Sequence, residues 1–296
     1  MALGGQVFGC GQCLPCRVNR RRMWTHRIML EATQHSVNSF WTLTYNDDTV
    51  PLTEGLLQTL VRKHLTDFVK RLREDYHPLK LRYFNVGEYG EQTGRPHYHL
   101  ALFNYPACDR GVTRQNRQST CCSICDSVRR IWGKGNVYSG QLEDASAAYI
   151  SGYVTKKLIS KDDARLKGRE KEFASMSLRP GIGAGFIDEV ASTLLEHNLD
   201  QLSDVPTSLA HGGRNRPLGR YLTRRLRVRT GKEPGAPQST LQAQQEKLQP
   251  LREAARVISP LKNYTETFKT VITETFEGEY HRLLGKQSVH KKREIL

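Results

Sequence analysis

The chain has 296 residues, 38% of them hydrophobic, which suffices for one large domain or a domain with a tail. Lys and Arg outnumber Asp and Glu by 45 to 30, and this surplus favours partners with phosphate backbones. The absence of a run of about 18 apolar residues and of an N-terminal secretion signal excludes a membrane partner and predicts a reducing cytoplasm, where cysteines serve as metal ligands or thiols.

Hydrophobic periodicity predicts alternating helices and strands through residue 157. Apolar residues at helical spacing indicate helices, and short aromatic and β-branched runs indicate strands. Helices are expected at 24–32, 57–76 and 146–157, and strands at 40–45, 81–90, 97–105 and within 131–142. Because strands joined by a tight loop are antiparallel, the expected fold is α+β, with a mostly antiparallel sheet flanked by helices.

The rest of the chain is more polar. Residues 106–127 form an insertion with four cysteines, residues 214–229 are strongly basic, and residues 230–250 have the composition of a linker. The last forty residues suggest one or two exposed helices. We therefore divide the chain into a domain at 1–200, which includes the cysteine-rich N-terminus and the insertion, and a basic, mainly helical or partly flexible region at 201–296.

His97 and His99 are two residues apart on a predicted strand, so both imidazoles lie on one face of it. If residues 91–94 form a four-residue hairpin loop, Glu88 pairs with His97 and becomes a third ligand on that face, with Glu91 as the alternative. Two imidazoles and a carboxylate with open positions suit Mg²⁺ or Mn²⁺ acting as a Lewis acid on a phosphate. The competing interpretation is a solvated strand whose histidines bind nothing.

Tyr149 and Tyr153 are four residues apart on a predicted helix, which places both phenols on one helical face. A tyrosine can attack a phosphodiester and form a phosphotyrosyl bond. Lys156 follows Tyr153 by three residues on the same face and is the better placed cation; Lys157 is the less well placed one. Two tyrosines permit two successive transesterifications. The competing interpretation is that the rings pack on the sheet.

The seven cysteines fall into an N-terminal group and a group in the insertion. One C-x-x-C pair from each would build a Cys₄ zinc site that joins the N-terminus to the insertion. The favoured ligands are Cys10, Cys13, Cys122 and Cys125, with Cys16 as an alternative to Cys13 and with Cys121 and Cys108 nearby. Reduced thiols in polar loops are the competing interpretation.

Arginines gather in two places, directly after the N-terminal cysteines and in the segment 214–229. Clusters of this kind track phosphates, and an aromatic neighbour such as Tyr221 can stack on a base. The arginines expected to contact DNA are Arg17, Arg20, Arg21, Arg22, Arg220, Arg224 and Arg225.

Five segments, in this order, resemble the replication initiator proteins of microviruses, small single-stranded DNA phages, especially the gokushovirus type. The resemblance covers about the first 230 residues and extends to the wider HUH endonuclease group. The segments are CGQCLPCRVNRRRMW, FWTLTY, RYFNVGEYGEQTGRPHYHLALF, SAAYISGYVTKK and FASMSLRPGIGAGF. No physical role can be assigned from sequence to the RPGIG motif at 179–183.

The resemblance implies an antiparallel sheet of about five strands and a site-specific single-stranded DNA endonuclease and ligase that initiates rolling-circle replication. A tyrosine would stay joined to the 5′ phosphate at the phage origin and free a 3′-OH. Host helicase and polymerase would be partners, in the bacterial cytoplasm. His97 and His99 match the family's histidine pair, and Tyr149 and Tyr153 match its tyrosine pair.

In related two-tyrosine initiators each tyrosine can be followed three residues later by a basic residue. Tyr153 has Lys156 at that position, whereas Tyr149 has Gly152. Tyr153 is therefore expected to attack first. The rival functions are an HUH transposase or relaxase, which keeps the chemistry, and a non-catalytic zinc-knuckle protein that binds single-stranded nucleic acid. The second rival leaves the histidines and tyrosines without a role.

Overall fold

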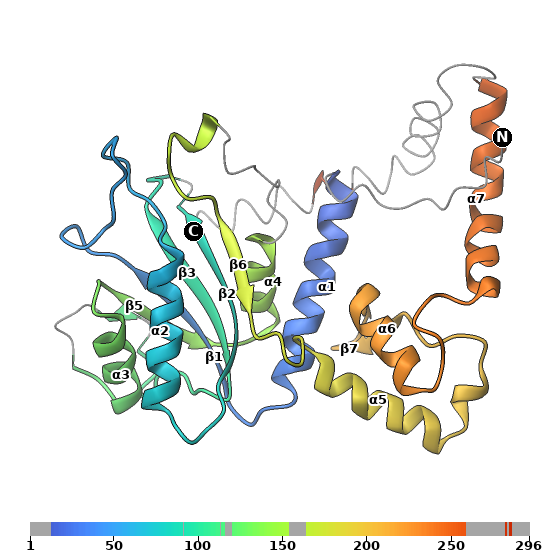
Figure 1. Cartoon of the computed structure of the whole chain (residues 1–296), viewed down its shortest axis with the longest axis horizontal. Coiled ribbons are helices and arrows are strands. Elements are labelled where there is room, and N and C mark those ends of the chain that lie inside the picture. Colours follow the sequence, from blue (N-terminus) through green and yellow to red (C-terminus); the bar gives the residue numbers. More distant parts are fainter. Residues whose placement is uncertain are drawn as a thin grey trace.

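The fold is given by a computed structural model that describes residues 13–90, 92–112, 114–115, 120–153, 164–258, 282, 284 and 285. Its centre is an antiparallel sheet with the strand order β4-β5-β1-β3-β2-β6 (Figure 1). The strands are β1 (Asn38–Thr44), β2 (Arg82–Tyr89), β3 (Pro96–Phe103), β4 (Arg114–Gln115), β5 (Val137–Gln141) and β6 (Phe173–Met176). The expected α+β class is confirmed: five strands have four residues or more, and the two-residue β4 extends one edge.

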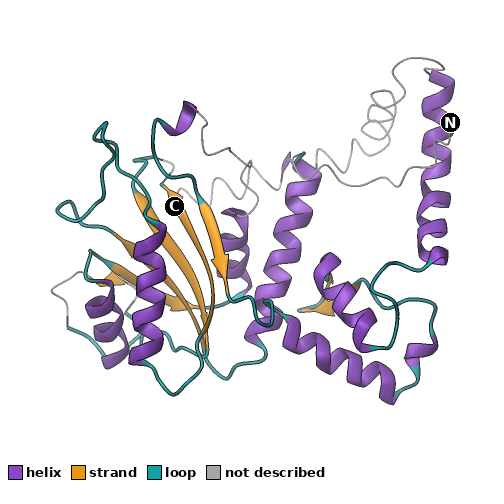
Figure 2. Ribbon diagram, viewed as in Figure 1, coloured by secondary structure: helices purple, strands orange, loops and turns teal. Residues whose placement is uncertain are grey.

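Helices cover both faces of this sheet (Figures 1 and 2). They are α1 (Leu14–Ala32), α2 (Arg62–Asp75), α3 (Ser123–Trp132) and α4 (Asp144–Tyr153). Helices α2 and α3 pack on the face that presents Tyr98 and Leu100 of β3, whereas α1 and α4 pack on the face that presents Ala101 and Phe103. Because side chains alternate along a strand, His97 and His99 lie on the α1/α4 face.

Two predicted helices begin elsewhere than expected. Helix α1 starts at Leu14, ten residues before the expected Trp24, with Pro15 in its first turn, where a missing N–H is tolerated. The helix expected at 57–76 starts at Arg62, because the preceding residues form an isolated bridge between Leu52 and Gln58. Helix α4 and strand β5 lie where a helix and a short strand were expected, although residues 154–157 lie outside the described part of the chain.

The C-terminal part forms a second, smaller apolar cluster beside α1. Its elements are α5 (Ala184–Glu196), the hairpin β7 (Ser208–His211) and β8 (Arg214–Pro217), α6 (Gly219–Arg229) and α7 (Gln238–Ile258), with short 3-10 turns at Ala164–Leu166 and Leu199–Gln201. The cluster joins Leu30 of α1 and Ile187 of α5 to Leu222 of α6, so it draws on both sides of the division made at residue 200. The linker expected at 230–250 is wrong, since α7 occupies most of it. Among the described helices, none is long and apolar enough to cross a bilayer.

The RPGIG motif at 179–183 joins α1 to the neighbouring elements. The backbone N–H of Gly183 donates to Glu31 Oε2 at 2.7 Å, and Arg27 Nε donates to the carbonyl of Ile182 at 3.0 Å. Gly183 has a φ of 78°, a conformation that favours glycine. The motif therefore has a structural role at a junction of the fold.

Glu31 is the buried anion of that junction, with 3% of its surface exposed. It pairs with Arg82 and accepts hydrogen bonds from His35 and from Gly183. We expect Glu31→Gln to lower the free energy of unfolding by roughly 3 kcal/mol, because the substitution leaves buried donors without their anion. Urea denaturation followed by circular dichroism measures this, and Glu189→Gln on the exposed surface of α5 is the control, expected near zero.

The cost of Glu31→Gln should depend on pH. Burial raises the pKa of Glu31, but the hydrogen bonds from His35 and Arg82 outweigh it and leave the pKa below its usual value. A carboxyl whose pKa is lowered by folding stabilises the protein above its unfolded pKa of about 4.3, and this contribution is lost as the pH falls through the folded pKa. The two proteins should therefore differ fully at pH 7 and converge below about pH 4; a constant difference would contradict the assignment.

Candidate metal and tyrosine site

His97, His99 and Glu88 come together at one end of the β2–β3 hairpin. The register pairs Glu88 with His97, as the four-residue loop predicted, and Gly90 N donates to the carbonyl of Arg95. One carboxylate oxygen, Glu88 Oε1, lies 2.8 Å from His97 Nε2 and 2.7 Å from His99 Nε2. The three ligand atoms lie within 4.8 Å of one another, so one ion can contact all of them.

The cluster is almost closed to solvent, with Glu88 2% and His99 4% exposed. Burial disfavours the ionised form of Glu88, but hydrogen bonds from His97 and His99 outweigh it and lower the pKa of Glu88 to about 2. The carboxylate is therefore anionic over the whole physiological range. A buried anion of this kind requires a cationic partner.

The second nitrogen of each imidazole shows how the rings are oriented. His97 Nδ1 lies 3.0 Å from the carbonyl of Arg95, which can only accept, so Nδ1 carries the proton. The Nε2 lone pair of a neutral His97 then faces the Glu88 oxygen, and two acceptors at 2.8 Å need a proton or a cation between them. His99 Nδ1 is likewise held, at 2.8 Å from Thr42 Oγ1. This donor set fits a divalent cation, with the outer nitrogens fixed as in metal sites.

Thr42 is a positioning residue that sequence reasoning missed, because the β1–β3 register that pairs Thr42 with His99 joins distant parts of the chain. We expect Thr42→Val, which keeps the shape and removes the hydroxyl, to weaken Mn²⁺ binding about 10-fold to 100-fold. Mn²⁺ titration followed by electron paramagnetic resonance measures this. Thr66→Val on exposed α2 is the control, and equal Mn²⁺ affinities for Thr42→Val and wild type would remove Thr42 from the site.

Both predicted tyrosines of α4 contact His99. The hydroxyl of Tyr149 lies 3.4 Å from His99 Nε2, and the ring of Tyr153 stacks on the His99 ring at 5.6 Å and 13°. The two phenol rings are 5.1 Å apart, and Phe40 stacks on His99 as well. Both tyrosine side chains are partly exposed. Helix α4 therefore presents two phenols to the same metal-ligating ring.

The cations expected beside these tyrosines are placed differently. Lys156 and Glu91, the alternative metal ligand, lie outside the described residues. Arg21 of α1, in contrast, lies against α4: its Nε donates to the carbonyl of Ala148 at 2.8 Å. A Cβ added to Gly152 would stand 3.7 Å from the Arg21 guanidinium carbon. Glycine at this position thus leaves room for a cation supplied by another helix.

The structure assembles a different set of cysteines from the one favoured by sequence. Cys122 and Cys125 lie with Cys108 and Cys121, and all four sulfur atoms are within 4.8 Å of one another. Cys13 is exposed at the start of α1 and is not a member of this group, whereas Cys10 lies outside the described residues. The sequence gives no local signal for this set, since residues 109–120 separate Cys108 from the others.

The two predicted arginine surfaces differ in how exposed they are. Of the N-terminal arginines, Arg22 is exposed and the others are partly exposed, all on α1. On α6, Arg220 and Arg224 are exposed, but Arg225 binds Asp188 through two hydrogen bonds of 3.0 and 2.6 Å. Arg225 is therefore engaged within the protein, and its predicted contact with DNA would require breaking that pair.

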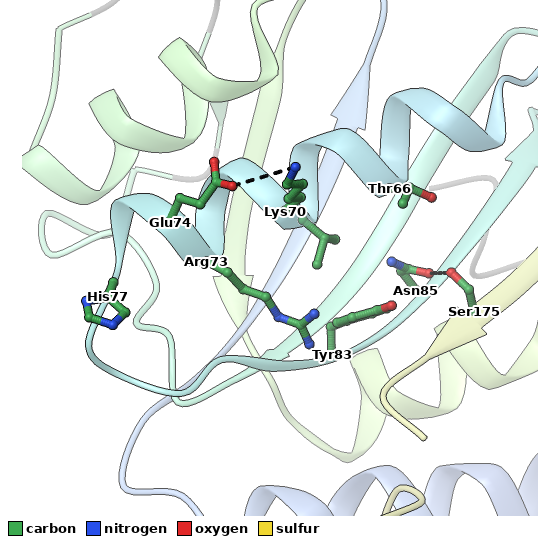
Figure 3. A pocket seen from close by; sticks show the side chains of 9 residues that line it. Thr66, Lys70, Arg73, Glu74, His77, Tyr83, Asn85 and Ser175 are labelled. Atoms are coloured by element: carbon green, nitrogen blue, oxygen red, sulfur yellow. Dashed lines mark hydrogen bonds and ion pairs between the residues drawn. The ribbon is translucent and has the colours of Figure 1, made fainter. Parts of the chain in front are cut away.

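A pocket lies between α2 and the strands β2 and β6 (Figure 3). Its lining includes Arg73, Tyr83 and Asn85, and Asn85 Oδ1 accepts a hydrogen bond from Ser175. Tyr83 and Asn85 alternate with Phe84 and Val86, which belong to the α1/α4 face. This pocket thus opens on the other face of the sheet from His97 and His99 and is separate from the candidate site.

Comparison with protein families defines the class. Residues 38–158, which span β1 to the end of α4, match the family model described as replication-associated protein ORF2, and the chain belongs to that family through this stretch. The stretch includes the His97/His99 cluster and both tyrosines. No solved structure matches the chain.

The chain is also similar to replication-associated proteins of three phages. It is 33% identical over 157 residues to replication-associated protein ORF2 of Spiroplasma virus 4, covering 52% of this chain and 49% of that protein. It is 32% identical to replication-associated protein VP4 of Bdellovibrio phage phiMH2K, over 54% of this chain and 52% of that protein, and 30% identical to replication-associated protein ORF4 of Chlamydia phage 1, over 57% and 44%. The chain thus matches about half the length of these relatives, and the phage resemblance expected from its motifs is confirmed.

Proposed function

We propose that the chain is a metal-dependent HUH-type nicking and joining enzyme that cuts single-stranded DNA at a phage origin to start rolling-circle replication. The observation that carries this proposal is the contact of two tyrosines with His99, itself held with His97 on the Glu88 carboxylate. A divalent cation held by these three residues would polarise a non-bridging phosphate oxygen and offset the charge that develops there. The relationship to phage replication-associated proteins supports the same role.

The bonds made and broken balance without a further reagent. The phenol oxygen of Tyr153 forms a bond to phosphorus, and the bond from phosphorus to the 3′ oxygen breaks. The phenol proton ends on that 3′ oxygen, which becomes a 3′-OH for a polymerase. The DNA strand remains joined to the protein through its 5′ phosphate. Tyr149 then attacks the next junction, and the freed 3′-OH closes the circle by attacking the first phosphotyrosine.

Covalent capture of DNA tests this function. Single-stranded oligonucleotides that tile the origin-bearing strand carry a 3′ label and are incubated with the chain and Mn²⁺. We expect a labelled protein band that survives denaturation, because the 3′ fragment stays attached through phosphotyrosine. EDTA should abolish the band, and so should the Tyr149→Phe/Tyr153→Phe double variant.

Two results would contradict the proposal. A band that persists in the double variant would place the nucleophile elsewhere, and a band of equal intensity in EDTA would remove the metal from the reaction. Binding of single-stranded DNA without any cleavage by the wild type would favour the non-catalytic binding protein. Tyr138→Phe on β5 is the matched control and should form the band as the wild type does.

Arg21 is expected to assist Tyr149, where the chain has Gly152 in place of a basic residue. Its guanidinium lies beside Gly152 and is tied to α4 through the carbonyl of Ala148. We expect Arg21→Gln to slow strand joining, the step assigned to Tyr149, about 10-fold or more, while first cleavage falls less. Comparing the two rates with a pre-cut and an uncut oligonucleotide measures this difference.

The control for Arg21 is Arg22→Gln, an exposed arginine one residue further along α1. If Arg22 acts only by general attraction to phosphates, its loss weakens both steps to the same small extent and more so at low salt. Equal losses of cleavage and joining in Arg21→Gln would show that Arg21 too only attracts DNA.

A further inference from the structure

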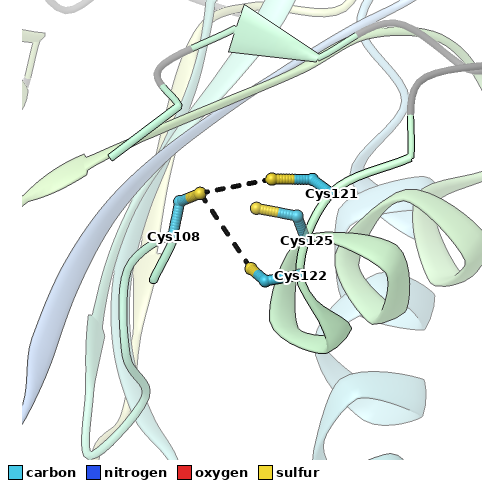
Figure 4. A group of neighbouring side chains, drawn as sticks. All are labelled: Cys108, Cys121, Cys122 and Cys125. Atoms are coloured by element: carbon cyan, nitrogen blue, oxygen red, sulfur yellow. Dashed lines mark hydrogen bonds between the residues drawn. The ribbon is translucent and has the colours of Figure 1, made fainter. Parts of the chain in front are cut away.

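Four sulfur atoms meet between the insertion and α3, on the α2/α3 side of the sheet (Figure 4). Cys108 Sγ lies 3.6 Å from Cys121 Sγ and 4.0 Å from Cys122 Sγ, and Cys125 completes the group within 4.8 Å. A disulfide holds its sulfurs at about 2.05 Å, so these separations exclude one. Four thiolates at about 2.3 Å from a tetrahedral zinc stand roughly 3.8 Å apart, which is the spacing observed.

The surroundings suit thiolates. Cys122 caps the N-terminus of α3 and Cys125 lies in its first turn, so the positive end of the helix faces the sulfurs. The backbone N–H groups of Asp109 and Cys125 donate to the Cys122 sulfur. The loop that carries Cys108 is anchored too, since its N–H donates to Ser139 Oγ at 2.9 Å.

The four cysteines are also well enclosed. Cys125 is fully buried, Cys108 and Cys122 are each 8% exposed, and only Cys121 is more open to solvent. They border the apolar cluster that contains Trp132 of α3 and Tyr105 after β3. A site with four protein ligands and no open position is typical of structural rather than catalytic zinc.

We propose that Cys108, Cys121, Cys122 and Cys125 bind one structural zinc ion that fastens the insertion to α3 and to the β5 edge of the sheet. Binding replaces the thiol protons and releases them to solvent. The site differs from the ligand set suggested by the sequence, in which Cys10 and Cys13 would tie down the N-terminus. It stands apart from the proposed nicking function, because it lies across the sheet from His99.

Cobalt substitution of the full chain tests the site. Co²⁺ in a tetrahedral thiolate site gives a sulfur-to-cobalt charge-transfer band and intense d–d bands, which a His₂Glu site does not give. We expect the wild type to show both, to lose them when one equivalent of Zn²⁺ is added, and to purify with zinc bound. Cys121→Ser, at the most exposed of the four positions, should lose most of the charge-transfer intensity and bind zinc at least about 10-fold more weakly.

The controls separate this site from the alternatives. Cys13→Ser and Cys16→Ser should keep the full spectrum, and His99→Ala and the double tyrosine variant should keep it as well, whatever happens to nicking. A wild-type chain without the charge-transfer band overturns the proposal even if the cysteine variants fail to fold. An unchanged spectrum in Cys121→Ser, or loss of the spectrum in Cys13→Ser, would also overturn it.

Discussion

His99→Ala is expected to lower the rate of covalent DNA–protein complex formation by roughly 10³-fold, because a Lewis-acid cation supplies several kcal/mol to phosphoryl transfer. His99 touches every part of the candidate site: Glu88 Oε1 at 2.7 Å, Thr42 Oγ1 at 2.8 Å and the rings of both tyrosines. The measurement is the rate at which 3′-labelled oligonucleotide becomes attached to protein in saturating Mn²⁺.

The matched control is His197→Ala, which removes a histidine at the exposed end of α5 and should leave the rate unchanged. Since His99 is buried, its replacement also tests the fold, and circular dichroism of the variant reports whether the sheet is intact. His97→Ala provides an independent reading, because the His97 side chain is more exposed, at 18% against 5% for His99. Wild-type rates in both folded variants would place the reaction outside this cluster.

The metal cluster could be predicted from sequence because its geometry is local. A strand period of two places His97 and His99 on one face, and a four-residue loop fixes Glu88 opposite His97; both features hold in the structure. The helical repeat likewise brought Tyr149 and Tyr153 to one face of α4. Each of these inferences needed no knowledge of contacts between distant segments.

What sequence could not predict are the contacts between segments far apart in the chain. Thr42 reaches His99 only through the β1–β3 pairing, and Arg21 reaches Gly152 only because α1 packs against α4. The cysteine set depends on where the loop after β3 returns to α3. C-x-x-C spacing identified Cys122 and Cys125 but carried no information on their two partners.

Charge was the other property that composition described incompletely. The segment 214–229 is basic in sequence, yet Arg227 binds Asp204 and Arg225 and Arg229 both bind Asp188. These acidic partners come from segments before α6 that carry no basic signal of their own. A cluster of arginines therefore indicates DNA only where the structure leaves the guanidinium groups exposed, as with Arg220 and Arg224.

Tyr153→Phe should abolish the first cleavage, by about 10⁴-fold or more, since phenylalanine has no oxygen with which to attack phosphorus. Tyr149→Phe should keep the first cleavage and lose the second. Phenylalanine preserves the ring that stacks on His99, so the fold and the metal ligands stay in place. The two steps are read separately, the first as the covalent band and the second as the joined product released from it.

The order of attack rests on the cations and not on the distances to His99. The Tyr149 hydroxyl approaches His99 Nε2 to 3.4 Å, so both phenols reach the site. Lys156, three residues after Tyr153, is the feature that favours Tyr153 for the first step. The opposite result, cleavage lost in Tyr149→Phe and kept in Tyr153→Phe, would assign the first attack to Tyr149 and the guiding cation to Arg21.

A shared histidine has a consequence for the joining step. Because Tyr149 and Tyr153 contact one ring and stand 5.1 Å apart, each phenol can address a phosphate held at the same place. The first phosphotyrosine then has to leave that place before the second junction enters it, which a short movement at the end of α4 would allow. The Tyr149→Phe variant should therefore accumulate the covalent complex, whereas the wild type should turn it over into joined DNA.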